Sequence, residues 1–222
     1  MGFLGPLASV HHPATSDSFA DQLRDLLTSW PVAGIVWDEL KALDTVDHSP
    51  AARRALGPAW SDDPAVHLAA QVAFFGRMNA WAKELKPVCR TSLFVHAHYT
   101  DPTLLASLAA MPGLDEFGCD GRPWAVADGG SNDSADGPPS KLLIDAGPRF
   151  IAAARAAGSV PLALIENHAL RASDLPLMER RLPAVRAQGW GHLLYYYFPR
   201  SCENPDASMR ILGEALARPT PG

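Results

Sequence analysis

The chain lacks the features that mark several large classes of protein. It has no cluster of Lys or Arg side chains, and its formal net charge is −5, so it offers little to neutralise the phosphates of a nucleic acid. No apolar run approaches the roughly 20 residues of a membrane span. The first residues also lack the basic and long apolar segments of a signal peptide. We therefore expect no nucleic-acid or membrane partner, and a cytoplasmic location by default.

Cysteine is scarce, and the glycines do not form a phosphate-binding turn. Cys89, Cys119 and Cys202 are odd in number and lack the spacing of metal or redox motifs, so a disulfide framework is not expected. Gly129 and Gly130 lie in a loop, without the spacing of the glycine-rich turn that follows the first strand of a dinucleotide-binding fold. The sequence therefore indicates neither a bound cofactor nor a structural metal.

Short apolar runs alternate with helical patterns from end to end, which predicts a parallel sheet with helical crossovers. We expect strands at 33–37, 91–96, 114–118, 161–165 and 192–198, and a possible one at 4–11. We expect helices from Ser16 or Asp17 to Trp30, from Asp62 or Asp63 to Leu85, and over 102–110, 142–157, 174–187 and 205–217. Residues 125–140 are rich in Gly, Ser, Asp and Pro and form a predicted loop within a single domain spanning 1–222.

Polar and aromatic residues stand at almost every expected strand end, as at the mouth of a barrel where all the loops converge. Five or six strand–helix units are too few to close an eight-stranded barrel. We therefore predict an α/β fold that is a partial TIM barrel, with the first two or three units missing. Such a sheet has two exposed edges, which favours self-association.

Two of these strand ends carry a glutamate. The apolar run from Gly34 stops at Glu39, and the run from Pro161 stops at Glu166. Two carboxyl groups facing one site suit general acid and nucleophile chemistry, and a retaining glycosidase holds them roughly 5–5.5 Å apart. Trp37 lies on the same side of its strand as Glu39 and would help keep that acid protonated.

The positions of the two glutamates resemble those of the clan A glycoside hydrolases, a large group of retaining TIM-barrel enzymes. Counted from the C-terminus, 192–198 corresponds to the eighth strand, so Glu166 falls on the seventh strand and Glu39 on the fourth. The resemblance implies that Glu39 is the acid/base and Glu166 the nucleophile. Asp38 stands where that clan usually has asparagine. The resemblance further implies a carbohydrate substrate. From their places at the strand ends, we expect this substrate to be bound by Trp37, His96, His98, Tyr99, Asp120, Arg122, Trp124, Asn167, His168, Tyr197 and Arg200.

Two alternatives remain open. His96-Ala97-His98 places two imidazoles on one side of a strand end, as in a metal-dependent hydrolase or isomerase, with Asp120 and His168 on other strands. The other alternative is a barrel that binds carbohydrate without turning it over. Bound zinc or manganese would indicate the first, and sugar binding without turnover the second.

Overall fold

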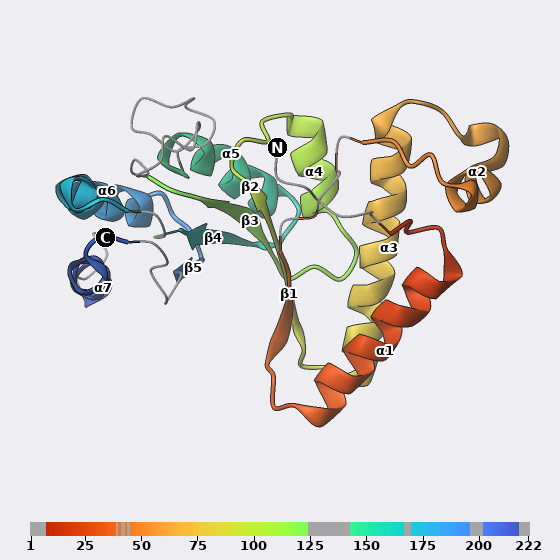
Figure 1. Ribbon diagram of the computed structural model, residues 1–222, viewed down its shortest axis with the longest axis horizontal. Helices are drawn as coiled ribbons and strands as arrows, with labels where there is room; N and C mark the ends of the chain where they lie inside the picture. Colours follow the sequence, from red (N-terminus) through yellow and green to blue (C-terminus); the bar gives the residue numbers. More distant parts are fainter. Residues whose placement is uncertain are drawn as a thin grey trace. The chain divides into compact units, whose positions relative to one another are not determined.

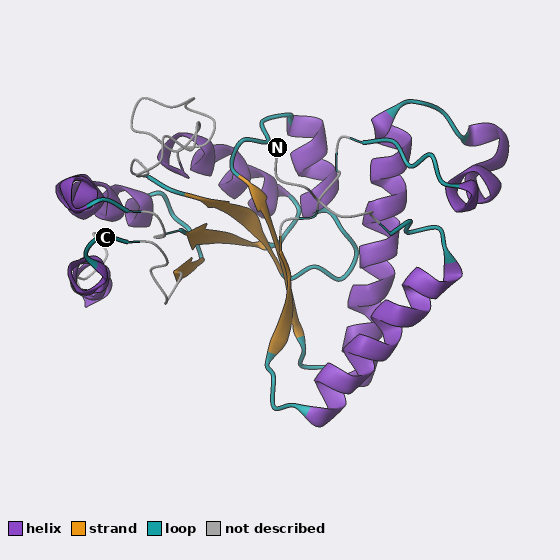
Figure 2. Cartoon of the chain, in the orientation of Figure 1, coloured by secondary structure: helices purple, strands orange, loops and turns teal. Residues whose placement is uncertain are grey.

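The computed structural model describes residues 8–38, 40, 43, 45–123, 143–166, 170–195 and 202–217. Strands and helices alternate along these residues, which confirms the predicted parallel α/β class (Figures 1 and 2). The α-helices are α1 Pro13–Ser29, α2 Pro50–Leu56, α3 Pro64–Leu85, α4 Pro102–Ala109, α5 Leu143–Ala156, α6 Leu175–Ala187 and α7 Pro205–Ala217. The strands are β1 Gly34–Asp38, β2 Arg90–His96, β3 Glu116–Gly121, β4 Val160–Ile165 and β5 His192–Tyr195. Short 3-10 turns occupy Gly57–Ala59 and Ala172–Asp174.

The five strands form a half-barrel sheet whose order follows the chain, β1-β2-β3-β4-β5. The pairs β2–β3, β3–β4 and β4–β5 are parallel. The chain divides into two compact units. The first comprises Met1–Val36, Leu40–Thr91 and Met111–Leu114, and the second comprises Trp37–Glu39, Ser92–Ala110 and Asp115–Gly222. None of the helices in the described ranges is long and apolar enough to cross a membrane.

Five helices begin at a proline that follows a capping residue. The caps are His12, Ser49, Asp63, Asp101 and Asn204, and each side chain accepts a hydrogen bond from a backbone N–H in the first turn of its helix. Proline suits the first helical position because its fixed φ is already helical and its missing N–H would have no partner there. The start of α3 at Asp63 confirms that part of the sequence analysis.

The expected strand at 4–11 is wrong over its described part. Residues 8–12 form coil and a turn that lead directly into α1. The helix begins at Pro13 rather than near Ser16, because the His12 ring Nδ1 accepts the Ala14 N–H at 3.2 Å and so caps the first turn. A histidine cap is unusual, which is why the sequence pattern pointed to a later serine or aspartate.

The first unit is built on the packing of α1 against α3, which lie side by side in Figure 1. Leu23 and Leu27 of α1 are buried, as are Phe74 and Met78 of α3. Phe19 packs edge-on to Phe74, with ring centroids 5.3 Å apart.

In the second unit, α5 packs on β3 and β4. The fully buried rings of Phe117 and Phe150 join the sheet to this helix, with centroids 5.8 Å apart. Because strand residues alternate between faces, Phe117 and Cys119 face α5, whereas Glu116, Gly118 and Asp120 share the opposite face. At Gly118 a Cβ would overlap the Leu162 carbonyl of β4, so only glycine allows this approach of the strands.

Candidate functional site

Polar side chains gather where β2, β3 and β4 end. The register pairs His96 with Asp120, and Glu166 comes directly after the β4 residue that pairs with Gly121. Two backbone hydrogen bonds of 3.1 Å continue the ladder past the strand ends, from Ala97 N–H to the Asp120 carbonyl and from Glu166 N–H to the Gly121 carbonyl. The functional side chains therefore stand on paired backbone, which fixes their positions.

These side chains line one small cavity of about 170 Å³ within the second unit. A water molecule takes a share of about 30 Å³ in the liquid, so the cavity suits a molecule equivalent to a few waters. Five of the residues predicted from the sequence to form the site meet here. The lining is His96, Ala97, His98, Asp120, Gly121, Arg122 and Glu166.

His96 and Asp120 form the first charged pair of the site. The imidazole Nδ1 lies 3.4 Å from Asp120 Oδ2. The Asp120 side chain is 2% exposed and the His96 side chain 39%, so a buried carboxylate stands behind an imidazole that solvent and substrate can reach. A carboxylate at Nδ1 orients the ring and stabilises its protonated form, which is the arrangement of a histidine that takes up and returns protons.

Arg122 and Glu166 form the second pair. The guanidinium Nε lies 3.4 Å from Glu166 Oε2, and the two side chains are only 12% and 14% exposed. Screening by water is weak at such burial, so each group helps to hold the orientation of the other. The planar guanidinium has five N–H donors and matches the geometry of a carboxylate, so Arg122 can also anchor an anionic group in the cavity.

His98 and Tyr99 extend the site on the side of β2. The rings of His96 and His98 stack with centroids 5.1 Å apart, and the Tyr99 ring lies 4.4 Å from that of His98. Within the described ranges, no group of three or more His, Cys, Asp or Glu side chains is arranged to hold a metal ion. The metal-dependent alternative therefore lacks a ligand set among these residues.

The other predicted site residues are placed only in part. Trp37 lies in β1 and is half-buried. The residues that fall outside the described ranges are Glu39, Trp124, Asn167, His168, Tyr197 and Arg200. The predicted separation of Glu39 and Glu166 therefore stays a prediction.

A third polar group, which the sequence analysis missed, lies on the same face of the sheet at its amino end. Glu116 is 3% exposed, and its Oε2 accepts a hydrogen bond of 2.8 Å from Ser92 Oγ. His192 Nδ1 of β5 lies 3.2 Å from the same oxygen. The two-residue spacing of Glu116, Gly118 and Asp120 could have indicated that both carboxylates share one face.

Cys119 lies next to this site without taking part in it. Burial raises the pKa of its thiol well above the usual value, and the neighbouring Asp120 carboxylate raises it further. The residue also faces α5 rather than the cavity. Cys119 therefore remains a neutral thiol of the core and is not a nucleophile.

Comparison with known proteins identifies no family, since no family model and no curated protein matches the chain. One solved structure that it matches is that of 2,3-dimethylmalate lyase, described as a member of the PEP mutase/isocitrate lyase superfamily. The sequences are 13% identical, the match covers 96% of this chain and 84% of the other, and the TM-score is 0.36.

The predicted activity is corrected at this point. The sequence favoured a hydrolase, namely a retaining glycosidase with a carbohydrate substrate, whereas the matched structure is that of a lyase. No family model or curated protein links the chain to glycosidases either. The glutamate that the structure does describe, Glu166, pairs with Arg122. The glycosidase and the carbohydrate-binding alternative are therefore dropped, while the resemblance to clan A stays an untested prediction.

Proposed function

We propose that the second unit is an enzyme that moves a proton on a small oxo or hydroxy acid. The observation that carries this proposal is the pairing of His96 with buried Asp120 beside Arg122 and Glu166, around a cavity of about 170 Å³. A group that exchanges protons and a group that binds carboxylates thus face the same small volume. Together they support this substrate class and reaction type.

Each side chain has a role in the proposed reaction. Arg122 binds the substrate carboxylate through its guanidinium, and Glu166 holds that guanidinium in place. His96 takes a proton from the carbon beside the substrate carbonyl through Nε2, while Asp120 stabilises the imidazolium from the Nδ1 side.

The test is solvent exchange on a panel of small acids. Pyruvate, oxaloacetate and 2-oxoglutarate are incubated in D₂O with the full chain, and the loss of their C–H signals is followed by ¹H NMR. We expect exchange of at least one acid above the uncatalysed rate. His96→Gln and Asp120→Asn should slow it roughly 100-fold or more, in keeping with the contribution of a general base.

Matched variants separate this role from a structural one. Asp145→Asn and Arg149→Lys change exposed residues of α5 and should leave exchange unchanged, whereas Arg122→Lys should raise KM more than it lowers kcat. If the wild-type chain binds and exchanges none of the acids, the two pairs only hold the strand ends together. The proposal is then wrong.

We further propose that the five strands are part of a TIM barrel and that the sheet associates through its edges. Support comes from the sequential strand order and from the polar cavity at the strand ends, both of which are typical of that fold. Light scattering during size-exclusion chromatography tests the association. A monomer at all concentrations would contradict it.

A further inference from the structure

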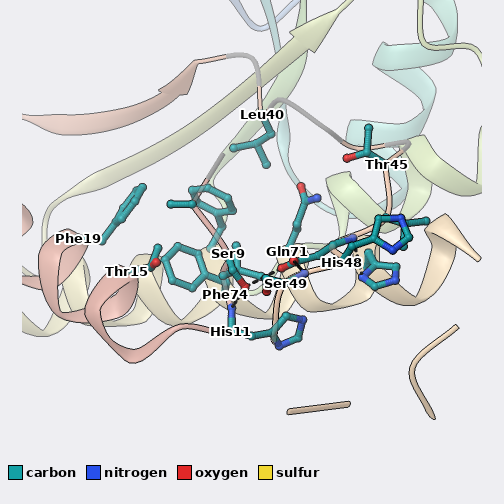
Figure 3. Close-up of a pocket in the computed structure, with 16 residues that line it drawn as sticks. Ser9, His11, Thr15, Phe19, Leu40, Thr45, His48, Ser49, Gln71 and Phe74 are labelled. Atoms are coloured by element: carbon teal, nitrogen blue, oxygen red, sulfur yellow. Dashed lines mark hydrogen bonds between the residues drawn. The ribbon is translucent and has the colours of Figure 1, made fainter. Parts of the chain in front are cut away.

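A second cavity lies wholly within the first unit, and none of its residues belongs to the proposed proton-transfer site. It has a volume of about 510 Å³, which is in the range of pockets that bind small organic molecules. Figure 3 shows Phe19 at the left of the view and His48 at the right, with Ser9, Phe74 and Ser49 between them. The lining combines aromatic rings, called here the aromatic side, with polar side chains, called here the polar side.

The aromatic side is formed by three rings packed edge to face. The ring centroids of Phe19 and Phe74 lie 5.3 Å apart, those of Phe19 and Phe75 6.0 Å, and those of Phe74 and Phe75 5.1 Å. The face of a phenyl ring carries negative electrostatic potential and attracts cations. Leu40 and Val46 add aliphatic surface to the lining.

The polar side is centred on Asp47, whose side chain and backbone are both hydrogen-bonded to neighbouring residues. Its Oδ2 accepts a hydrogen bond of 2.6 Å from Ser9 Oγ, and its Oδ1 accepts one of 2.8 Å from Ser49 N–H. Its backbone N–H donates to His67 Nδ1 at 3.3 Å, and its carbonyl accepts the Trp60 indole N–H at 3.1 Å. The carboxylate is therefore held in place before any ligand arrives.

Asp47 is ionised at neutral pH. Partial burial raises the pKa of its carboxyl group, but the hydrogen bonds from Ser9 and Ser49 and the nearby His11 together lower that pKa below its usual value. Among the 16 described residues that line the cavity there is no Lys, Arg or Glu, so Asp47 is the one side chain of fixed charge in the lining. His11 also lines the cavity, and its buried Nε2 has no hydrogen-bond partner among the described residues.

We infer that this cavity binds an organic ammonium ion with an aromatic or apolar body. The ammonium group would pair with Asp47, and the body would lie against Phe19 and Phe75, which are partly exposed, whereas Phe74 is fully buried and only supports these two rings. A carboxylate beside aromatic faces favours a cation over a neutral or anionic molecule of the same shape. The inference does not depend on the proposed proton transfer, because the two cavities share no residue.

Three probes of nearly the same shape test the charge preference. Phenethylamine is a cation at pH 7, 2-phenylethanol is neutral and phenylacetate is an anion. Binding is followed by the NMR shift of the Trp60 indole N–H, which donates to the Asp47 carbonyl and so reports from this cavity. We expect the amine to bind with a Kd of roughly 0.1–1 mM, the alcohol about tenfold more weakly, and the acid not at all.

Variants then locate the preference. Asp47→Asn keeps the shape of the side chain but removes its charge, so it should weaken amine binding roughly tenfold and leave alcohol binding unchanged. Asp62→Asn changes an exposed carboxylate of the same unit and should alter neither. Phe75→Leu should weaken both the amine and the alcohol.

Three outcomes would overturn the inference. Equal binding of the three probes would mean a cavity without charge selection, and preference for phenylacetate would mean an anion site. If the Trp60 signal does not shift at probe concentrations up to 10-fold above the expected Kd, the cavity binds none of these molecules. The wild-type series decides among these outcomes even if Asp47→Asn does not fold.

Discussion

The buried carboxylate of Glu116 allows a sharp test of what holds β2 to β3. Ser92→Ala removes the hydroxyl that donates to Glu116 Oε2 at 2.8 Å, with almost no loss of volume. Both residues are buried, Ser92 at 4% and Glu116 at 3% exposure, so water cannot easily replace the lost donor. A hydrogen bond to a charged group contributes about 1.5–3 kcal/mol, and we therefore expect a loss of about 2 kcal/mol in the free energy of unfolding.

Ser208 provides a matched control within the same unit. It is fully buried, but its hydroxyl donates to the thioether of Met178 at 3.7 Å, which is a weak acceptor. Ser208→Ala should therefore cost about 0.5 kcal/mol or less. Urea unfolding followed by circular dichroism measures both variants, and hydrogen exchange in Glu116–Gly121 locates the effect. If Ser92→Ala costs no more than Ser208→Ala, the carboxylate does not depend on this hydroxyl and the reasoning fails.

Four further predictions concern residues of the sheet and, for one of them, Cys202. The Tyr195 hydroxyl is buried without a hydrogen-bond partner among the described residues. Tyr195→Phe should therefore leave the free energy of unfolding in urea unchanged or raise it by about 1 kcal/mol. A loss of more than about 1 kcal/mol would contradict this. Gly118→Ala should cost more than about 4 kcal/mol in the same assay, since its methyl would overlap the Leu162 carbonyl, and a stable variant would refute the close approach of the strands. Burial raises the pKa of the Cys119 and Cys202 thiols, most strongly that of Cys119. Cys119 should therefore resist iodoacetamide until the protein unfolds, whereas half-buried Cys202 should react in the native state. The unfolded state releases the Cys119 proton near the usual pKa of 9.0, whereas the folded state keeps it. The free energy of unfolding should therefore fall as the pH rises through 9.0. A free energy of unfolding that stays constant up to about pH 10 would contradict this.

Much of the fold follows from local patterns in the sequence. Apolar runs and helical periodicity place the strands and helices, and the Asp63-Pro64 pair places the start of α3. The meeting of His96 with Asp120 also follows, because both residues lie at the carboxyl ends of parallel strands that pair with each other. These predictions succeed because they rest on local spacing and on one general property of parallel sheets.

The sequence does not predict which side chains from distant segments meet, nor which groups a candidate catalytic residue will face. Ser92, Glu116 and His192 belong to three strands, and only the register brings them together. The cavity around Asp47 depends on His67, which is 20 residues away and hydrogen-bonded to the Asp47 backbone. The expected glycosidase failed for a related reason. Counting strand–helix units gives the position of a glutamate in a fold, but not the groups it will face.

The proline-led helix starts affect the chain before it folds. The residue before a proline is restricted to extended backbone even in an unfolded chain, and the proline itself already has the φ of a helix. The caps of α1 to α4 keep that extended geometry in the native state, from φ −84° and ψ 127° at His12 to φ −66° and ψ 116° at Asp101. Little conformational entropy is therefore lost at these junctions on folding, and nucleation is favoured at the first turn of each helix. An isolated peptide from Ser61 to Leu85 should accordingly begin its helical segment at Pro64, with no neighbouring helix to guide it.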